Sequence, residues 1–128
     1  MKPTTAEWIE KAEGDFATMQ RKSRARKNPN YDAICFHAQQ CAEKYLKARL
    51  SEAETAFGKV HDLVALLELV LTVQADWEVF REDLAYLSDF AVSFRYPGES
   101  ANRESSLDAV RRYRFFHKIS RSALGLPS

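Results

Sequence analysis

The most constraining feature of the sequence is a stretch over residues 30–50 in which apolar side chains recur at steps of three and four. That spacing places them on one face of a helix with about 3.6 residues per turn. It predicts one long helix over residues 30–50. The side chains that set the pattern are Tyr31, Ile34, Cys35, Ala38, Cys41, Ala42, Tyr45 and Leu46.

Two further helices are expected around this one. The first covers residues 5–24, where Thr4 and Glu7 form a capping-box pattern at its start, and its spacing is set by Trp8, Ala12, Phe16 and Met19. A basic stretch at 21–27, followed by Asn-Pro-Asn, marks its end. The other opens at His61-Asp62, with Asp62 as its cap and an apolar face of Leu63, Leu66, Leu67, Val70 and Leu71.

The C-terminal part predicts two more helices. Asp76 is the expected cap of the first, which stops at Pro97-Gly98 and whose spacing is set by Trp77, Phe80, Leu84, Leu87 and Ala91. Ser105 together with Asp108 is expected to cap the last helix. That helix ends at Gly125 and turns five side chains inward, namely Leu107, Val110, Tyr113, Phe116 and Ser120.

No segment alternates with period two for long enough to predict a strand. Gly and Pro occur four times each, which favours few, long elements over a many-stranded sheet. No repeat or linker divides the 128 residues. We therefore expect one all-α domain over residues 1–128, a single up-and-down bundle of four to five helices.

The charge and the cysteines narrow the function classes. A formal net charge of +1 gives no bulk attraction for nucleic acid or membranes, so any such argument must be local. The longest apolar run, at 63–73, is too short to span a membrane and contains Glu68, so a cytoplasmic protein is expected. Cys35 and Cys41 point apart on one helix and are expected to be buried, reduced thiols.

Three motifs in a fixed order carry a family resemblance: FHAQQCAEKYLK at 36–47, HDL at 61–63 and RYP at 95–97. Together they resemble the HEPN domain of small bacterial and archaeal proteins and of sacsin, over nearly the whole chain. The resemblance implies a helical bundle that commonly dimerises. It also implies a function with nucleotides or RNA. Many HEPN proteins are encoded beside a minimal nucleotidyltransferase in toxin–antitoxin pairs, and others bind nucleotides or cut RNA.

Four donor-capable side chains fall on one stripe of the helix over 30–50, beside its apolar face, at about 100° per residue. They are His37, Gln40, Lys44 and Lys47. Such a stripe is able to hold an anionic ligand through charge-assisted hydrogen bonds. In the alternative interpretation Lys44 and Lys47 form a solvated face, balanced by Glu43 and nearby acids.

Arg95 precedes Tyr96-Pro97 at an expected helix end, where a guanidinium is able to reach a phosphate. A cation there also complements the helix dipole, which is the alternative interpretation. The RYP resemblance favours a functional Arg95. Arg95 and the four side chains of the stripe are therefore the predicted nucleotide- or anion-binding residues.

The resemblance also bears on catalysis. HEPN ribonucleases are similar to one another in an Arg followed, after four to six residues, by a His where the last helix begins. Here the positions after Arg95 that should hold the His are 100–102, and they hold Ser, Ala and Asn. The spacing recurs as Arg111 or Arg112 with His117, inside the last helix. Without a His near Arg95, cleavage through the 2′-OH lacks its usual general acid or base.

We therefore expect a non-catalytic HEPN module that binds a nucleotide or RNA as a homodimer and acts with a minimal nucleotidyltransferase. The alternative is a metal-independent ribonuclease toxin that uses Arg112 and His117. The homodimer also rests on a surplus of large apolar side chains, namely Phe36, Phe90, Phe94, Phe115 and the two tryptophans. His37 and Cys41 lack a second pair of ligands, so no metal and no cofactor are predicted.

Overall fold

The computed structural model describes residues 1–93 and 98–127, the side chains of residues 90–93 excepted. Within that part of the chain the secondary structure is helical, with no strand, which confirms the predicted all-α bundle. Its elements are α1 (Pro3–Ser23), α2 (Tyr31–Glu52), α3 (Leu63–Val70), a short 3-10 helix η1 (Ala75–Phe80), α4 (Arg81–Ser93) and α5 (Arg103–Ala123).

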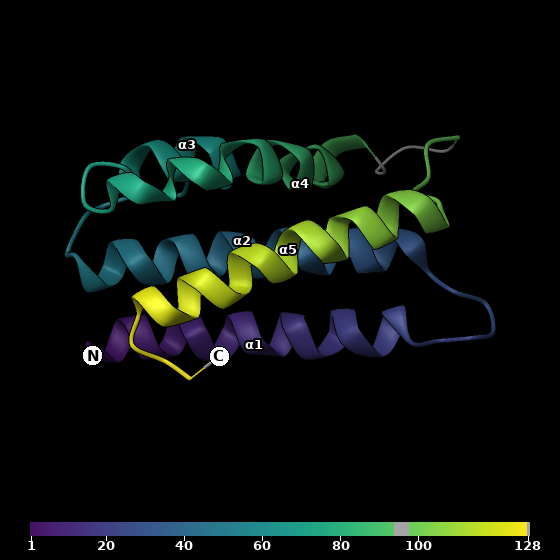
Figure 1. The fold of residues 1–128 in the computed structure, drawn as a ribbon, viewed down its shortest axis with the longest axis horizontal. Coiled ribbons are helices and arrows are strands. Elements are labelled where there is room, and N and C mark those ends of the chain that lie inside the picture. Colours follow the sequence, from purple (N-terminus) through teal and green to yellow (C-terminus); the bar gives the residue numbers. More distant parts are fainter. Residues whose placement is uncertain (94–97, 128) are drawn as a thin grey trace.

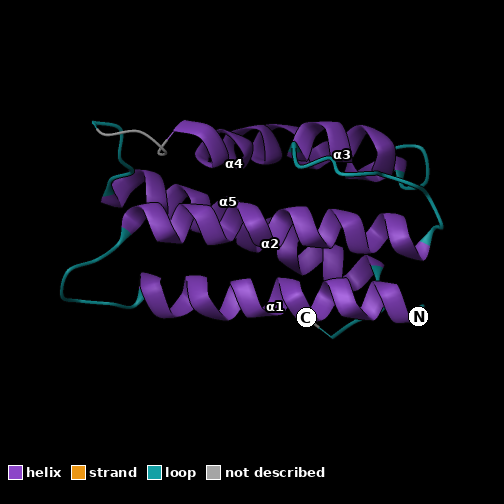
Figure 2. Ribbon diagram, turned by 180° about the vertical axis from the view of Figure 1, so that it is seen from behind, coloured by secondary structure: helices purple, strands orange, loops and turns teal. Residues whose placement is uncertain are grey.

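The helix α2 lies at the centre of the bundle and packs against α1, α3, α4 and α5 (Figure 1). Seen from behind, α1 lies on one side of α2, and α3 and α4 lie on the other (Figure 2). The end of α1 and the beginnings of α2 and α5 meet at one end of the molecule (Figures 1 and 2). The RYP motif, at residues 95–97, lies outside the described residues.

The core is built around α2 from side chains of every helix. An aromatic cluster joins η1 to α5, where the ring centroids of Trp77 and Phe80 lie 5.6 Å and 4.9 Å from that of Phe116. The cluster is buried, and so are the apolar side chains around it. These surrounding side chains include Ile34, Ala38, Leu46, Leu50, Leu63, Leu66, Leu67, Leu84, Leu87 and Tyr113.

The helix beginnings show which predicted caps are correct. Asp62 caps α3, because its carboxylate accepts a hydrogen bond of 2.9 Å from the backbone N–H of Ala65, as predicted. The prediction for Thr4 is wrong: α1 begins at Pro3, whose ring cannot donate and needs no partner. Asp76 is not a cap either, because it lies inside η1.

The last helix begins earlier than the sequence predicted. Its cap is Asn102, whose side-chain oxygen accepts a 2.8 Å hydrogen bond from the backbone N–H of Ser105. The Ser105 hydroxyl in turn accepts from the N–H of Asn102 at 3.0 Å, which completes a capping box. Ser105 is therefore the third residue of the helix and not its cap.

Two burial predictions also need correction. Leu107 is 57% exposed rather than inward-facing, since the buried face of α5 passes through Ser106 and Ala109 and Leu107 points away from that face. The tryptophans are not surplus apolar surface: Trp77 is 1% exposed, and the half-buried Trp8 packs edge-on against Phe57. Phe36 and Phe115 do remain exposed, while Phe94 and the side chain of Phe90 lie outside the described residues.

The cysteines agree with the expectation from the sequence. Cys35 and Cys41 are free, buried thiols. Burial raises the pKa of the Cys35 thiol to about 12 and that of Cys41 well above its ordinary value, so neither is a thiolate at neutral pH. In addition, none of the described helices combines the length and the apolar character that crossing a bilayer requires.

The aromatic cluster offers a matched test of the packing. Replacing Phe116, which is fully buried, with Ala should lower the free energy of unfolding by about 3 to 5 kcal/mol. The same substitution at its neighbour Phe115, which is 45% exposed, should cost only about 1 kcal/mol. Urea unfolding followed by circular dichroism measures both, and equal losses in the two variants would contradict this packing.

Candidate functional site

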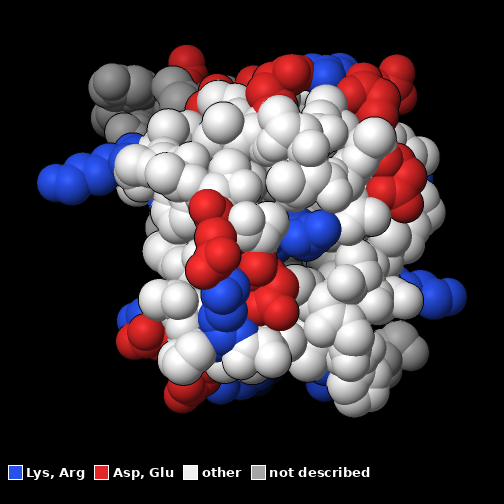
Figure 3. Space-filling view, turned by 90° about the vertical axis from the view of Figure 1, so that its left-hand side faces the viewer, with Lys and Arg blue, Asp and Glu red and all other residues white. Residues whose placement is uncertain are grey.

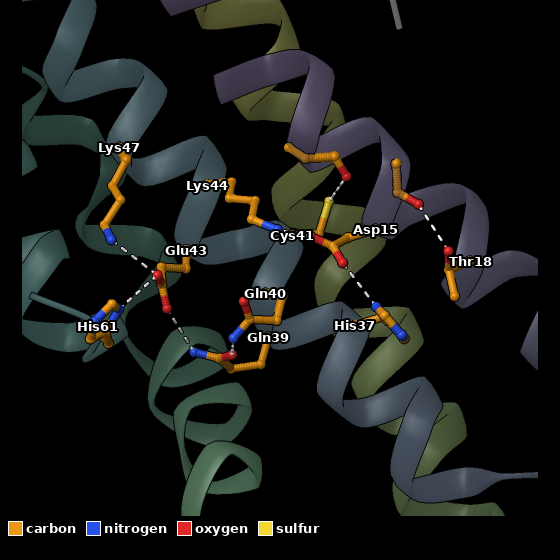
Figure 4. Close-up of polar contacts among 12 residues, drawn as sticks. Asp15, Thr18, His37, Gln39, Gln40, Cys41, Glu43, Lys44, Lys47 and His61 are labelled. Carbon is orange, nitrogen blue, oxygen red and sulfur yellow. Dashed lines mark hydrogen bonds and ion pairs between the residues drawn. The ribbon is translucent and has the colours of Figure 1, made fainter. Parts of the chain in front are cut away.

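The structure divides the predicted stripe on α2 into two clusters, each built around a carboxylate (Figure 4). In the first, Asp15 of α1 faces α2. One of its oxygens lies 2.9 Å from Nδ1 of His37, and the other pairs with the ammonium of Lys44. Both side chains of this half of the stripe are thus oriented by one acid from the neighbouring helix.

The second cluster lies toward the C-terminal end of α2. Lys47 is only 4% exposed, and its ammonium lies 3.0 Å from the carboxylate of Glu43 and 5.3 Å from the centre of the Trp8 ring. The same carboxylate oxygen lies 3.1 Å from Nδ1 of His61 (Figure 4). Lys47 is therefore a buried, paired cation rather than an open donor.

Gln40 lies between the two clusters and donates to the side-chain oxygen of Gln39 at 2.8 Å. An anion approaching the stripe would have to displace the carboxylates of Asp15 and Glu43 from its cations. Acids do lie beside the stripe, as in the alternative interpretation, but Lys47 is buried and is not part of a solvated face. Anion binding by these four residues stays a prediction.

Arg95 lies outside the described residues. Residues 100–102, where a HEPN ribonuclease would carry its His, are described. The backbone N–H of Ala101 donates to the carboxylate of Asp32 at 2.6 Å, which ties this segment to the beginning of α2. Asn102 caps α5. The positions where a HEPN ribonuclease would carry its His therefore serve to anchor and begin the last helix.

Arg112 and His117 are five residues apart and face opposite sides of α5. Arg112 turns toward α4, where a guanidinium nitrogen lies 2.9 Å from the carboxylate of Asp83 and the group covers the ring of Tyr86 at 4.4 Å. His117 turns toward α1, where its ring stacks on Phe16 with centroids 4.1 Å apart. One phosphate cannot contact both side chains within a single chain.

His117 belongs to a polar cluster that no spacing in the sequence indicates. Its Nε2 lies 2.8 Å from the carboxylate of Glu13, which also accepts from the hydroxyl of Tyr45. Arg121 donates to the same hydroxyl at 3.0 Å. A carboxylate only accepts hydrogen bonds. Nε2 of His117 therefore carries the proton of the ring and donates a hydrogen bond to Glu13.

Burial sets the charge states of this cluster. It lowers the pKa of His117 below the ordinary value of 6.5, and the nearby Glu13 offsets this only in part. Burial alone would raise the pKa of Glu13, but the hydrogen bonds from Tyr45 and His117 outweigh it and hold that pKa below 4.5. The cluster thus contains a neutral imidazole and an ionised carboxylate at neutral pH.

A cavity of about 370 Å³ opens at the end of the bundle where α1, α2 and α5 meet, and we call it the basic cavity. Its floor is apolar, with Ile34 and Val110, and Tyr31 supplies an aromatic wall. Four exposed cations surround it, namely Lys22, Arg24, Arg26 and Arg103, and no carboxylate belongs to its lining. None of the four forms an ion pair with another described residue.

Sequence reasoning missed the basic cavity, although part of its signal was visible. The run of Lys and Arg at 21–27 marks the end of the first helix, and it also supplies three of the four cations. The fourth, Arg103, lies some eighty residues further along the chain and reaches the cavity only because α5 begins beside the end of α1.

The cysteine and histidine side chains do not assemble into a metal centre in the described part of the chain, where no group of three or more potential ligands converges. His37 is turned toward Asp15, while the Cys41 thiol lies 3.0 Å from the carbonyl oxygen of Ala12 and contacts the hydroxyl of Tyr113. The two side chains therefore have separate partners.

The low pKa of His117 predicts how stability depends on pH. Because the unfolded chain binds a proton at this ring first, the free energy of unfolding should fall as the pH drops through about 6.5. Replacing His117 with Gln should flatten the profile between about pH 7 and pH 5, as measured by urea unfolding. The control is His61→Gln, at an imidazole whose side chain is 72% exposed. A His117→Gln profile as steep as that of the unchanged protein would contradict this cause.

Comparison with families of known proteins identifies the chain. The family model for the HEPN domain matches residues 5–123, which is nearly the whole of the described bundle. Comparison with curated proteins and with solved structures yields no match. Since the family model covers more than nine-tenths of the sequence, and the helical bundle agrees with it, the chain belongs to the HEPN family.

Proposed function

We propose that this protein is a non-catalytic HEPN module that binds the phosphate of a nucleotide or of RNA in the basic cavity. It acts as a homodimer in the cytoplasm, beside a minimal nucleotidyltransferase in a pair of the toxin–antitoxin type. Family membership supports a role with nucleotides or RNA. The pairing with a nucleotidyltransferase rests on the family resemblance alone.

The observation that carries the proposal is the uncompensated charge around the basic cavity. The chain as a whole is nearly neutral, at +1, yet Lys22, Arg24, Arg26 and Arg103 gather here without a carboxylate among them. Many other charged side chains are paired, such as Lys44 with Asp15 and Arg112 with Asp83. At the opposite end of the bundle, acidic and basic side chains are interspersed (Figure 3), and the ammonium of Lys2 lies 3.0 Å from Glu54.

A cluster of unpaired cations of this kind suits an anionic ligand. Like charges gathered on one surface repel, and a dianionic phosphate reduces that repulsion while accepting their hydrogen bonds. Arg95 precedes α5 in the sequence by only eight residues. Its predicted role in phosphate binding is compatible with this location.

The absence of catalysis is supported by the roles that the candidate residues already have. Asn102 occupies a position that would hold the family's His, and its side chain is engaged in capping α5. Arg112 and His117 face different helices. A dimer is supported by the exposed rings of Phe36 and Phe115, since large exposed apolar side chains favour association.

We expect the purified protein to leave single-stranded RNA and tRNA uncut, because no His is placed with an Arg to transfer a proton at one phosphate. Replacing His117 with Ala should change the thermal stability, through loss of the stacking on Phe16 and the bond to Glu13, and not an activity. Metal-independent cleavage that His117→Ala abolished, in a variant still folded by circular dichroism, would favour the ribonuclease alternative.

Removing two cations of the basic cavity tests the binding function. The double variant Arg24→Ala/Arg103→Ala should bind a fluorescent single-stranded RNA about tenfold more weakly at low salt. Its affinity should also depend less steeply on salt concentration, because fewer counterions are released. Fluorescence anisotropy over a range of salt concentrations measures both effects.

The matched control is Lys11→Ala/Lys59→Ala, which removes the same charge from two exposed cations elsewhere on the molecule. It should bind nearly as tightly as the unchanged protein. An equal loss in both double variants would mean that only the overall charge matters, and would refute a site at the basic cavity.

A further inference from the structure

A second cavity, of about 600 Å³, lies on the other side of the beginning of α5. We call it the acidic cavity, and its lining consists of Tyr86, Asn102, Glu104, Ser105, Leu107, Asp108 and Arg111. Leu107 lines both cavities, so they adjoin across the first two turns of α5. The side chain of Leu107 is 57% exposed and forms the crest between them.

The two cavities differ sharply in charge. Among the described residues that line it, the acidic cavity has the carboxylates of Glu104 and Asp108 and one cation, Arg111, which is paired with Asp108. Asp108 also lies 3.3 Å from the guanidinium of Arg112. Glu104, in contrast, is exposed and forms no ion pair with another described residue. A phosphate is therefore repelled from this cavity and attracted to its neighbour.

The lining of the acidic cavity fits a nucleobase instead. Tyr86 and Leu107 supply apolar surface for a flat ring. The Tyr86 ring is held in place, because its hydroxyl donates to the carbonyl of Ser105 at 3.2 Å and the guanidinium of Arg112 lies 4.4 Å from its centre. The carboxylate of Glu104 accepts hydrogen bonds only, so it favours a base that presents an amino group.

We propose that the two cavities divide one nucleotide unit between them, with its phosphate in the basic cavity and an amino-bearing base in the acidic cavity, selected by Glu104. This inference rests on the proposed function. It adds a preference among nucleobases, which phosphate binding in the basic cavity alone does not provide. Cytosine, adenine and guanine carry an exocyclic amino group, whereas uracil presents a carbonyl oxygen that the Glu104 carboxylate would repel.

The test compares cytidine with uridine, whose bases carry an amino group and a carbonyl oxygen, respectively, at the same ring position. Binding of CMP, UMP, and single-stranded oligo(C) and oligo(U) of equal length is measured by calorimetry and anisotropy with the full chain. We expect about tenfold tighter binding of the cytidine form. The discrimination appears with CMP if the ligand is a free nucleotide, and only with oligo(C) if it is an RNA strand.

The variant Glu104→Gln should reduce this discrimination to about threefold or less, because an amide both donates and accepts and therefore suits either base. The control Glu10→Gln, at an exposed carboxylate of α1, should keep the full preference. Circular dichroism confirms that both variants fold.

The outcomes separate this inference from the proposed function. If cytidine and uridine probes bind equally well, the base site is refuted while phosphate binding stands. If the preference for cytidine survives in Glu104→Gln, the role of Glu104 is refuted. If none of the four probes binds, the proposed function fails, and the base site fails with it.

Discussion

The packing of α2 against four other helices is the constraint on which the rest of the structure depends. Because α1, α3, α4 and α5 all contact this helix, most of its circumference is withdrawn from water. Apolar side chains such as Ile34, Ala38 and Leu46 satisfy this condition directly. Each polar side chain on α2, however, needs a partner from a neighbouring helix or within α2 itself, since an unpaired buried polar group is costly.

These partners fix how the helices lie against α2. Tyr45 is bonded to Glu13 of α1 and to Arg121 of α5, which joins three helices through one hydroxyl. Lys47 and Glu43 pair within α2, and such a buried pair stabilises little in net terms, although removing one partner is strongly unfavourable. The polar stripe that the sequence suggested as an anion site thus already contributes to the bundle, through Asp15 and Glu43.

Much of the fold could be predicted because helical periodicity is a local property. The spacing over residues 30–50 and the cap at Asp62 depend on neighbours a few residues away, and both agree with the structure. The failures at Asp76 and Ser105 have one cause: several residues near a helix start are able to cap it, and tertiary packing decides which does. The inward position expected for Leu107 is wrong because the buried face of α5 passes through Ser106 and Ala109 instead. The basic cavity was unpredictable for a different reason, since Arg24 and Arg103 meet only in three dimensions.

The beginning of α5 shows how a helix cap positions residues of the two cavities. Asn is among the best helix caps and His is not, so the Asn at position 102 secures the first turn of this helix. That turn carries Arg103 and Glu104, adjacent residues about 100° apart around the helix axis, and each lines a different cavity. A frayed first turn would let both side chains move away from their cavities. The cap at Asn102 therefore keeps a cation and a carboxylate on opposite sides of Leu107, which is the arrangement that the proposed nucleotide site requires.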